Sequence, residues 1–349
     1  GEAHAVMLTD ASGTAVITGL IVETGGDLYV TVTKHNHIPY EGVITVKDRK
    51  KMALNWLRSQ QKPQGYWVFS GYGGEIPTTA LTGMAILALL NSGADLDDPN
   101  VSLGLSSLLS AVSPSGAITY VWNAVGVYET SGALFGLIAA RTKYFIENSM
   151  AITSPYDNVI QNAYNYLLNM QCIGLTRDLV DYQEATNLLY GGWGYPRGIP
   201  ENPNLIEGWA DMSNTQFALL ALRACDDSTN IAKGGRPIGL AATHLDWLTN
   251  QPASVSGVET FVSRCWNVSG NTYIPVGLPT PVYYDGGYNY KPAGTVDSGS
   301  HSQDRSYGSM TAAGIWSLWC ANVPVGTDAR YWDAKAWFDS HFSVDINPV

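Results

Sequence analysis

A two-helix unit recurs along most of the sequence and limits the folds that the chain can adopt. In each copy an amphipathic segment is followed by a loop rich in glycine and aromatic residues, and then by a segment that is apolar almost all round. The apolar segments are Thr78–Leu90, Ser131–Ala140, Thr215–Ala224 and Met310–Trp319. A helix that is apolar on every side must be buried, whereas an amphipathic helix buries one face. Because such units bury their apolar faces against their neighbours, the repetition predicts an array of helical hairpins with buried inner and amphipathic outer helices.

The amphipathic segments echo one another at their ends, in Trp56–Gln60, Tyr166–Gln171 and Trp247–Gln251. The outer helices are predicted to begin at Met52 and to include Leu103–Val112, Ile160–Met170 and Leu240–Leu248, with Tyr331–Phe342 starting a fifth hairpin.

The loops and helix starts resemble those of the prenyltransferase and squalene-cyclase repeat superfamily over about residues 50–349. The resemblance is carried by Gln60 with Gly65 and Trp67, and by Gly191–Tyr195, Asp285–Tyr288, Tyr128–Ser131, Asp211–Leu220 and Tyr307–Gly314. It implies a mainly α protein, an α/α toroid of the terpenoid-cyclase and prenyltransferase type. A closed ring of this family has more hairpins than this chain, so the toroid is expected to be incomplete.

A short β segment precedes the repeats. The predicted domain boundary separates this segment, residues 1–47, from the helical repeats, residues 48–349. The predicted strands are Ala5–Thr9, Thr14–Leu20, Leu28–Thr33 and Gly42–Val46, with a turn at Asp10–Gly13. The stretches Thr9–Gly13, Val30–Asn36 and Pro39–Gly42 resemble the immunoglobulin-like domain of gingipain-type cysteine peptidases. This implies a partial Ig-like domain without the peptidase's catalytic part. Since both domains look short, the chain is expected to belong to a larger precursor or assembly.

Composition excludes several classes of protein. The net charge of −11 and a sequence pI near 4.9 argue against nucleic-acid binding, which needs a basic face. The apolar runs are shorter than the ~20 residues that span a bilayer. Low lysine with abundant Tyr, Gly, Ser, Thr and Asn is typical of extracellular, cell-surface or periplasmic proteins. The sequence leaves open whether the four cysteines, Cys172, Cys225, Cys265 and Cys320, form disulfides.

Known catalytic motifs are weak or missing in the sequence. Asp95–Asp98 matches the Asp-x-Asp-Asp acid motif of squalene–hopene cyclases, but it lies between Gly93 and Pro99. These residues predict a solvated turn, in which carboxylates stay ionised. His301 precedes the last inner helix without the Asp-x-Cys pair that completes the zinc site of protein prenyltransferases. We therefore predict no metal and no cofactor.

Four acids each precede an inner helix: Glu75, Glu129, Asp211 and Asp304. If the inner helices run parallel, these acids gather at one mouth of the toroid. One interpretation is helix capping, since acids favour helix N-termini. The other is an acid-rimmed cleft for a cation, sugar or peptide, with Trp193 and Tyr288 as stacking surfaces. For the two aromatics we favour the alternative role, packing between hairpins.

The resulting hypothesis is a non-catalytic interaction or scaffold module. Its partners would be polypeptide segments that complete the toroid and the β domain, or further copies of the chain. One alternative is a terpene cyclase or prenyltransferase relative with Glu129 and Asp211 as its acids, because aromatic rings stabilise carbocations. A second alternative is a toroid that binds or cleaves carbohydrate.

Overall fold

The computed structural model describes residues 5–16, 26–46, 48–71, 74–120, 126–149, 153–175, 181–182, 187–195, 209–225, 252–274, 284–292 and 305–343. The chain divides into two compact units, Gly1–Gln60 and Gln61–Val349. The described residues form nine helices and four two-stranded antiparallel sheets, which confirms a mainly α protein. The division falls after the first helix, whereas the change from strand to helix periodicity predicts a boundary before that helix, between residues 47 and 48.

The described residues of the N-terminal unit form one β-hairpin and one helix. Strands β1 (Gly26–Val32) and β2 (Tyr40–Val46) pair with Val32 opposite Tyr40, as their β-branched alternation predicts. Helix α1 (Arg49–Ser59) is capped by Asp48, which accepts a hydrogen bond from the Lys51 amide. None of the described residues of this unit is buried.

The turn predicted at Asp10–Gly13 is confirmed, because the Asp10 amide donates to the Thr14 carbonyl at 2.8 Å. The strand predicted at Ala5–Thr9 is wrong, since these residues pair with no described strand. The segment Thr14–Leu20 lies largely outside the described residues, and an Ig-like sandwich remains a prediction.

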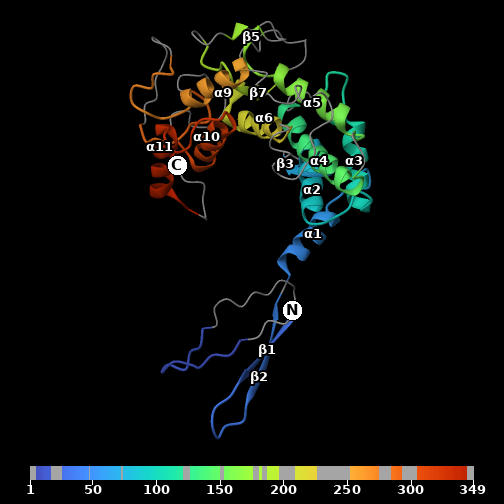
Figure 1. The fold of residues 1–349 in the computed structure, drawn as a ribbon, viewed down its shortest axis with the longest axis vertical. Coiled ribbons are helices and arrows are strands. Elements are labelled where there is room, and N and C mark those ends of the chain that lie inside the picture. Colours follow the sequence, from blue (N-terminus) through green and yellow to red (C-terminus); the bar gives the residue numbers. More distant parts are fainter. Residues whose placement is uncertain are drawn as a thin grey trace. The chain divides into compact units, whose positions relative to one another are not determined.

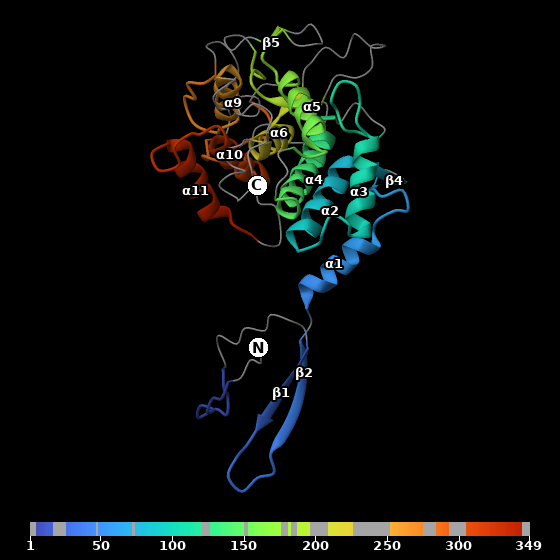
Figure 2. The ribbon, with the colours of Figure 1, turned by 45° about the vertical axis from the view of Figure 1, so that its right-hand side comes forward.

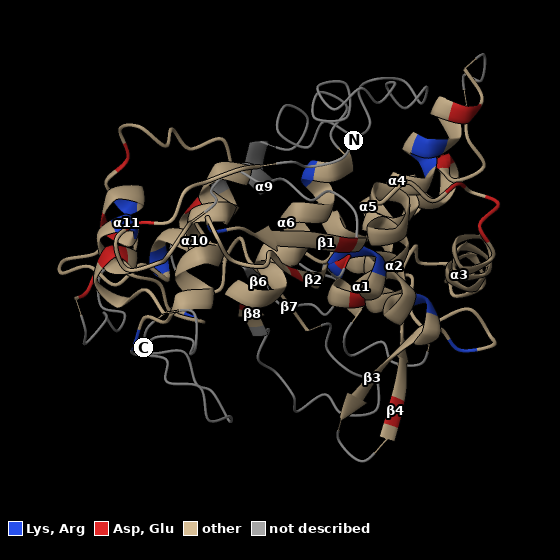
Figure 3. Cartoon of the chain, turned by 90° about the horizontal axis from the view of Figure 1, so that it is seen from below, with Lys and Arg blue, Asp and Glu red and all other residues tan. Residues whose placement is uncertain are grey.

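Four apolar helices form the interior of the C-terminal unit. They are α2 (Thr79–Asn91), α4 (Gly126–Glu147), α6 (Met212–Cys225) and α10 (Gly308–Cys320). Each packs against the next in this order (Figure 1). Helices α2 and α10 carry no charged residue, so their ribbons are entirely tan in Figure 3. The predicted burial of Thr78–Leu90 and Thr215–Ala224 is confirmed, since Ile86 and Leu222 are fully buried.

These four inner helices run parallel. A Cβ on Gly132 would meet Ala80, and one on Gly136 would meet Gly83, so the contact between α2 and α4 advances along both helices. The Tyr128 hydroxyl donates to Ser213 Oγ at the starts of α4 and α6.

At the C-terminal ends of α6 and α10, the Arg223 guanidinium lies 5.5 Å from the centre of the Trp319 ring. The N-termini of the inner helices therefore point the same way.

Four outer helices pack on this row: α3 (Pro99–Ser110), α5 (Asp157–Asn169), α9 (Pro252–Arg264) and α11 (Ala329–His341). Helix α3 contacts α2, α5 contacts α4 and α6, and both α9 and α11 contact α10 (Figure 2). The outer helix predicted at Leu240–Leu248 lies outside the described residues. Helix α9 was not predicted, although Val258, Phe261 and Val262 form its buried face.

A glycine turn precedes each inner helix and lies on the following outer helix. The four glycines are Gly65, Gly116, Gly191 and Gly286, with φ of 94°, 89°, 92° and 82°. A Cβ on the first three would run into the backbone of Leu103 in α3, Asn162 in α5 and Gly257 in α9, respectively, and a Cβ on Gly286 would lie 3.0 Å from the side chain of Asp333 in α11. Only glycine combines a positive φ with so close an approach.

The residue two positions after each glycine is tied to the inner helix in the same way in all four hairpins. Its backbone N–H donates to a threonine hydroxyl of that helix, in the pairs Trp67–Thr82, Ile118–Thr130, Trp193–Thr215 and Tyr288–Thr311, at 3.0–3.1 Å. We call this arrangement of glycine, backbone N–H and threonine the hairpin joint. It fixes each inner helix to the next outer helix.

Short strand pairs lead from some of these joints into the inner helices. Strand β3 (Trp67–Gly71) pairs with β4 (Gly74–Thr78), and β7 (Trp193–Tyr195) pairs with β8 (Trp209–Asp211). A third pair, β5 (Gly174–Leu175) with β6 (Asp181–Tyr182), follows α5. The pairing of Trp193 with Asp211 places the start of α6 beside its joint.

The hairpin joint gives a matched pair of alanine substitutions. Gly191→Ala should lower the free energy of unfolding by about 3 kcal/mol or more, because its Cβ has no space against Gly257. Gly270→Ala, at a φ of 66° with open space around the new Cβ, should cost only about 1 kcal/mol. Urea denaturation of both variants measures the difference. Equal losses would show that backbone conformation, rather than contact at the joint, is decisive.

Candidate functional site

The structure places the predicted acids in different surroundings. Glu75 lies on β4 at the surface and forms an ion pair with Lys62 at 2.6 Å. Asp304 lies outside the described residues. Glu129 and Asp211 are both buried at the starts of inner helices, and of the three acids that the structure describes only these two have the sheltered position that chemistry or recognition would use.

Glu129 stabilises the neighbouring inner helix. Its carboxylate accepts hydrogen bonds from the Thr79 amide and, at 2.6 Å, from the Thr79 hydroxyl in the first turn of α2. Burial raises the pKa of Glu129, and these hydrogen bonds oppose the increase. The side chain thus caps α2 from its position in α4.

Asp211 is fully buried and caps its own helix. One carboxylate oxygen accepts from the Asn214 amide at 2.7 Å, and the other accepts from Asn214 Nδ2 at 2.9 Å. Burial raises the pKa of Asp211 to about 6, although the bonds from Asn214 and the nearby Tyr290 and Lys291 lower it. The pKa of the buried Cys265 thiol is raised by burial and by the charge of Asp211.

Four partly exposed tyrosines surround Asp211. They are Tyr128 from α4, Tyr195 from β7, Tyr290 after the last glycine turn and Tyr307 at the start of α10. Burial raises the pKa of each hydroxyl, and the negative charge of Asp211 raises it further. The Tyr128 ring lies 5.8 Å from the Tyr195 ring and 5.3 Å from that of Phe217, between centroids.

Two further buried polar residues belong to this group. The Asn214 side chain is fully buried, and its Oδ1 accepts no hydrogen bond from any described residue. A buried acceptor without a donor costs about 1–3 kcal/mol. Lys291 is also buried, and its Nζ lies 5.9 Å from the centre of the Tyr290 ring. We call the set of Asp211, Asn214, Lys291, Tyr128, Tyr195, Tyr290 and Tyr307 the Asp211 cluster.

Trp193 and Tyr288, the expected stacking surfaces, are both fully buried. Trp193 Nε1 donates to the Leu167 carbonyl of α5 at 2.7 Å. The Tyr288 ring lies against Gly314 of α10, where a Cβ would approach within 2.5 Å. Neither ring is open to a ligand in this structure, so both serve packing between hairpins.

The Asp-x-Asp-Asp sequence forms the solvated turn that its flanking residues predict. Asp95 is exposed and pairs with Lys143 at 2.6 Å. Asp98 caps α3 by accepting from the Asn100 amide at 2.9 Å. The motif therefore lacks the apolar cavity that a protonated catalytic acid needs.

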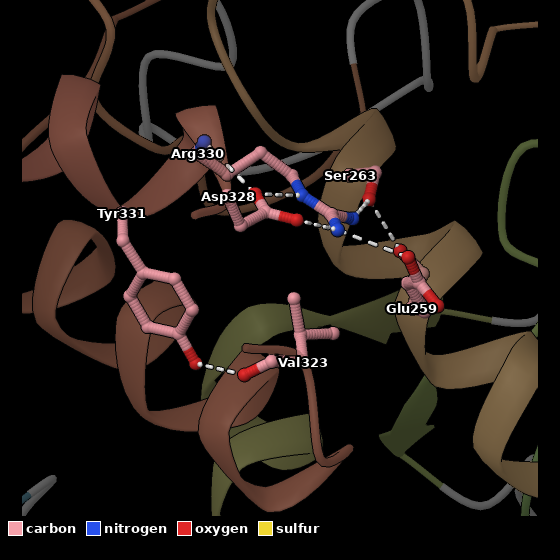
Figure 4. Close-up of polar contacts among 6 residues, drawn as sticks. All are labelled: Glu259, Ser263, Val323, Asp328, Arg330 and Tyr331. Atoms are coloured by element: carbon pink, nitrogen blue, oxygen red, sulfur yellow. Dashed lines mark hydrogen bonds and ion pairs between the residues drawn. The ribbon is translucent and has the colours of Figure 1, made fainter. Parts of the chain in front are cut away.

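A second buried polar cluster has a structural role (Figure 4). The buried Arg330 donates from Nε to Asp328 at 2.7 Å and from Nη2 to Glu259 at 2.9 Å, and Nη1 donates to Ser263. Arg330 lowers the pKa of Asp328 through these contacts. Because Glu259 and Ser263 lie on α9 while Arg330 lies on α11, the cluster joins two outer helices.

The described residues include no group of three or more His, Cys, Asp or Glu side chains placed to hold a metal ion. The four cysteines are all buried free thiols. Within the described ranges, the helices are too short or too polar to cross a membrane.

The sequence pattern marked Asp211 as a candidate, but it gave no indication of Asn214 or Lys291 as partners of this carboxyl. Asn214 lies inside a stretch singled out for its family resemblance, and nothing in its own pattern marks it as a partner of Asp211. Comparison with known proteins adds no further residue: no protein-family model matches the sequence, and no curated protein is significantly similar to it.

The raised pKa of Asp211 predicts a dependence of stability on pH. Between the unfolded pKa of 3.8 and the folded value of about 6, only the folded chain holds this proton, so the group's stabilisation is lost as pH rises through the folded pKa. The free energy of unfolding of the wild type, relative to Asp211→Asn, should fall by about 2 kcal/mol between pH 4.5 and 7.5. Urea titrations at both pH values measure it. The control is Asp339→Asn, which removes an exposed carboxylate. The free energy of unfolding of the wild type relative to this control should not change between the two pH values. A fall of the same size relative to both variants would contradict the assignment to Asp211.

Proposed function

We propose that this chain is a non-catalytic interaction module of an extracellular, cell-surface or periplasmic protein. It consists of an incomplete α/α toroid preceded by a partial Ig-like β domain. It works within a larger precursor or assembly, whose other polypeptide segments, or further copies of the chain, complete both parts.

The toroid is supported by the repeated packing in the C-terminal unit. Parallel inner helices contact one another in sequence order, and outer helices cover them. The hairpin joint recurs four times with the same donor and acceptor types. A row that adds one parallel helix per hairpin, with the outer helices on one side, is the local geometry of an α/α toroid.

The Asp211 cluster carries the proposal of a binding role. The four tyrosines are partly open to solvent, yet they surround a fully buried carboxyl and a buried amide oxygen that has no donor among the described residues. Buried polar groups are normally satisfied, and an unsatisfied one needs an explanation. A ligand that supplies donors beside exposed aromatic rings is such an explanation.

The exposed apolar residues of the N-terminal unit support association. Val32 of β1 and Tyr40 and Ile44 of β2 share one apolar face of the hairpin and are 51%, 67% and 56% exposed. A two-stranded hairpin is marginally stable alone, and its unpaired edges attract further strands. A second sheet packed on this face would bury these side chains.

An enzyme related to terpene cyclases is the second candidate. One observation favours it: a buried carboxyl with a pKa of about 6, beside aromatic rings, is suited to general acid catalysis. The hydrogen bonds that Asp211 accepts within its own helix favour capping, and the interaction module remains our proposal.

Incubation with squalene and with prenyl diphosphates separates these two functions. We expect the wild type to form no product, and Glu129→Gln and Asp211→Asn to behave like it. Mass spectrometry of the extracts is the measurement. A product that the wild type forms and Asp211→Asn does not would establish the enzyme and overturn the proposal.

Sedimentation velocity of the full chain over a range of concentrations tests association through the N-terminal unit. The wild type should associate as concentration rises, and Ile44→Lys should shift the equilibrium toward monomer at least tenfold, because it places a charge on the apolar face. Thr31→Lys, which adds the same charge at an exposed polar position, is the matched control. A wild type that stays monomeric throughout would contradict self-association.

A further inference from the structure

We propose that the Asp211 cluster binds the ring of a neutral sugar. This inference rests on the proposed interaction module and specifies the chemistry of its ligand. The juxtaposition that carries it is a set of partly exposed tyrosine rings around a buried Asp–Asn pair whose amide oxygen has no donor among the described residues.

The charges of the cluster favour a neutral ligand. The buried carboxyl of Asp211 lies close enough to the buried Lys291 for the lysine's positive charge to lower the carboxyl's pKa. The two charges offset each other. Asp211 would repel an anion, and Lys291 would repel a cation. A charged ligand of either sign therefore gains little electrostatic energy from this pair. Buried charges are stable only when paired, which also argues against a ligand that adds a third.

The aromatic rings offer flat apolar surfaces to a ligand. Tyr128, Tyr195 and Phe217 are all partly exposed. The centroid of the Tyr128 ring lies 5.8 Å from that of Tyr195 and 5.3 Å from that of Phe217. A pyranose has two apolar C–H faces that pack on such rings, and its edge carries hydroxyl groups. Tyrosine provides this apolar area together with a polar tip.

The polar groups of the cluster complement hydroxyl groups. A sugar hydroxyl is both donor and acceptor, as are the hydroxyls of the tyrosines and of Ser213, which accepts from Tyr128. Asn214 Oδ1 needs a donor, and a sugar hydroxyl or a water held beneath it supplies one. A hydrocarbon ligand would leave this acceptor unsatisfied. A ligand with adjacent donors and acceptors on an apolar ring is therefore the best complement.

The site is fixed by the hairpin joints rather than by one loop. Tyr128 begins α4, Tyr195 ends the β7 strand that starts at the joint residue Trp193, and Tyr290 lies two residues after the joint residue Tyr288. The Met212 amide also donates to the Tyr290 carbonyl at 2.8 Å, which ties this loop to the start of α6. Three hairpins thus hold the rings in place before any ligand arrives, which lowers the cost of binding.

Saturation-transfer NMR on the full chain tests the inference. The probes are the methyl glycosides of glucose, galactose, mannose and N-acetylglucosamine, with methyl sialoside and tetramethylammonium as an anionic and a cationic probe. At least one neutral glycoside should bind with a dissociation constant of about 1–10 mM, through its C–H face. The charged probes should bind at least tenfold more weakly.

Variants locate the binding. Tyr128→Ala should weaken the glycoside at least tenfold, whereas Tyr128→Phe, which keeps the ring, should weaken it only about threefold. Tyr284→Ala removes an exposed tyrosine outside the cluster and should leave affinity unchanged. Circular dichroism and melting temperature identify any variant that fails to fold. In that case the affinities of Tyr128→Phe and Tyr195→Phe are compared with that of the wild type.

A further measurement compares the methyl glycoside that binds with the trisaccharide of the same sugar. Tighter binding of the trisaccharide would indicate that the natural ligand is a glycan chain, and equal affinity would indicate a free sugar.

The inference is overturned if no neutral glycoside binds, if only a charged probe binds, or if Tyr128→Ala and Tyr284→Ala bind alike. Such a result would leave the interaction module standing, because the sedimentation and product assays do not depend on sugar binding.

Discussion

The hairpin joint is the contact on which the rest of the C-terminal unit depends. At each joint a glycine with positive φ lies against the next outer helix, and at Gly65, Gly116 and Gly191 it lies so close to that helix's backbone that no Cβ fits. Two residues later, a buried backbone N–H is satisfied by a threonine of the inner helix. Buried amides must find an acceptor, so the threonine fixes where the loop meets its helix. Repetition of this one contact ties each of the four inner helices to an outer helix in the same way.

A consequence of the parallel row is that polar chemistry collects at one end of the inner helices. The N-terminal turns of α2 and α6 have backbone amides that need acceptors, and Glu129 and Asp211 supply them. The carboxyls are buried because the neighbouring helices and loops pack over them. The same loops bring tyrosines to this end, and the Asp211 cluster follows from helix capping combined with hairpin packing.

Much of the helical structure could be predicted because burial leaves a periodic pattern in the sequence. The apolar segment Thr78–Leu90 corresponds to α2, and the Gly-Pro context of Asp95–Asp98 correctly indicates a solvated turn. Helix α9 escaped prediction because its buried face is short and is interrupted by Ser and Thr. The strand predicted at Ala5–Thr9 failed because alternation shows only that a strand would suit the residues, whereas pairing needs a partner.

The sequence by itself determined the four inner helices and the solvated turn at Asp95–Asp98, since helix periodicity, glycine turns and capping residues act within a few positions of one another. It also marked Asp211 and Glu129 as residues at helix starts. Only the tertiary structure decided that Trp193 and Tyr288 are buried while Tyr128 stays partly open, and that Tyr128 meets Ser213 across 85 positions of sequence. The physical reason is that exposure depends on which neighbours pack over a side chain. Those neighbours come from other hairpins, whose approach is set by the joints rather than by local pattern.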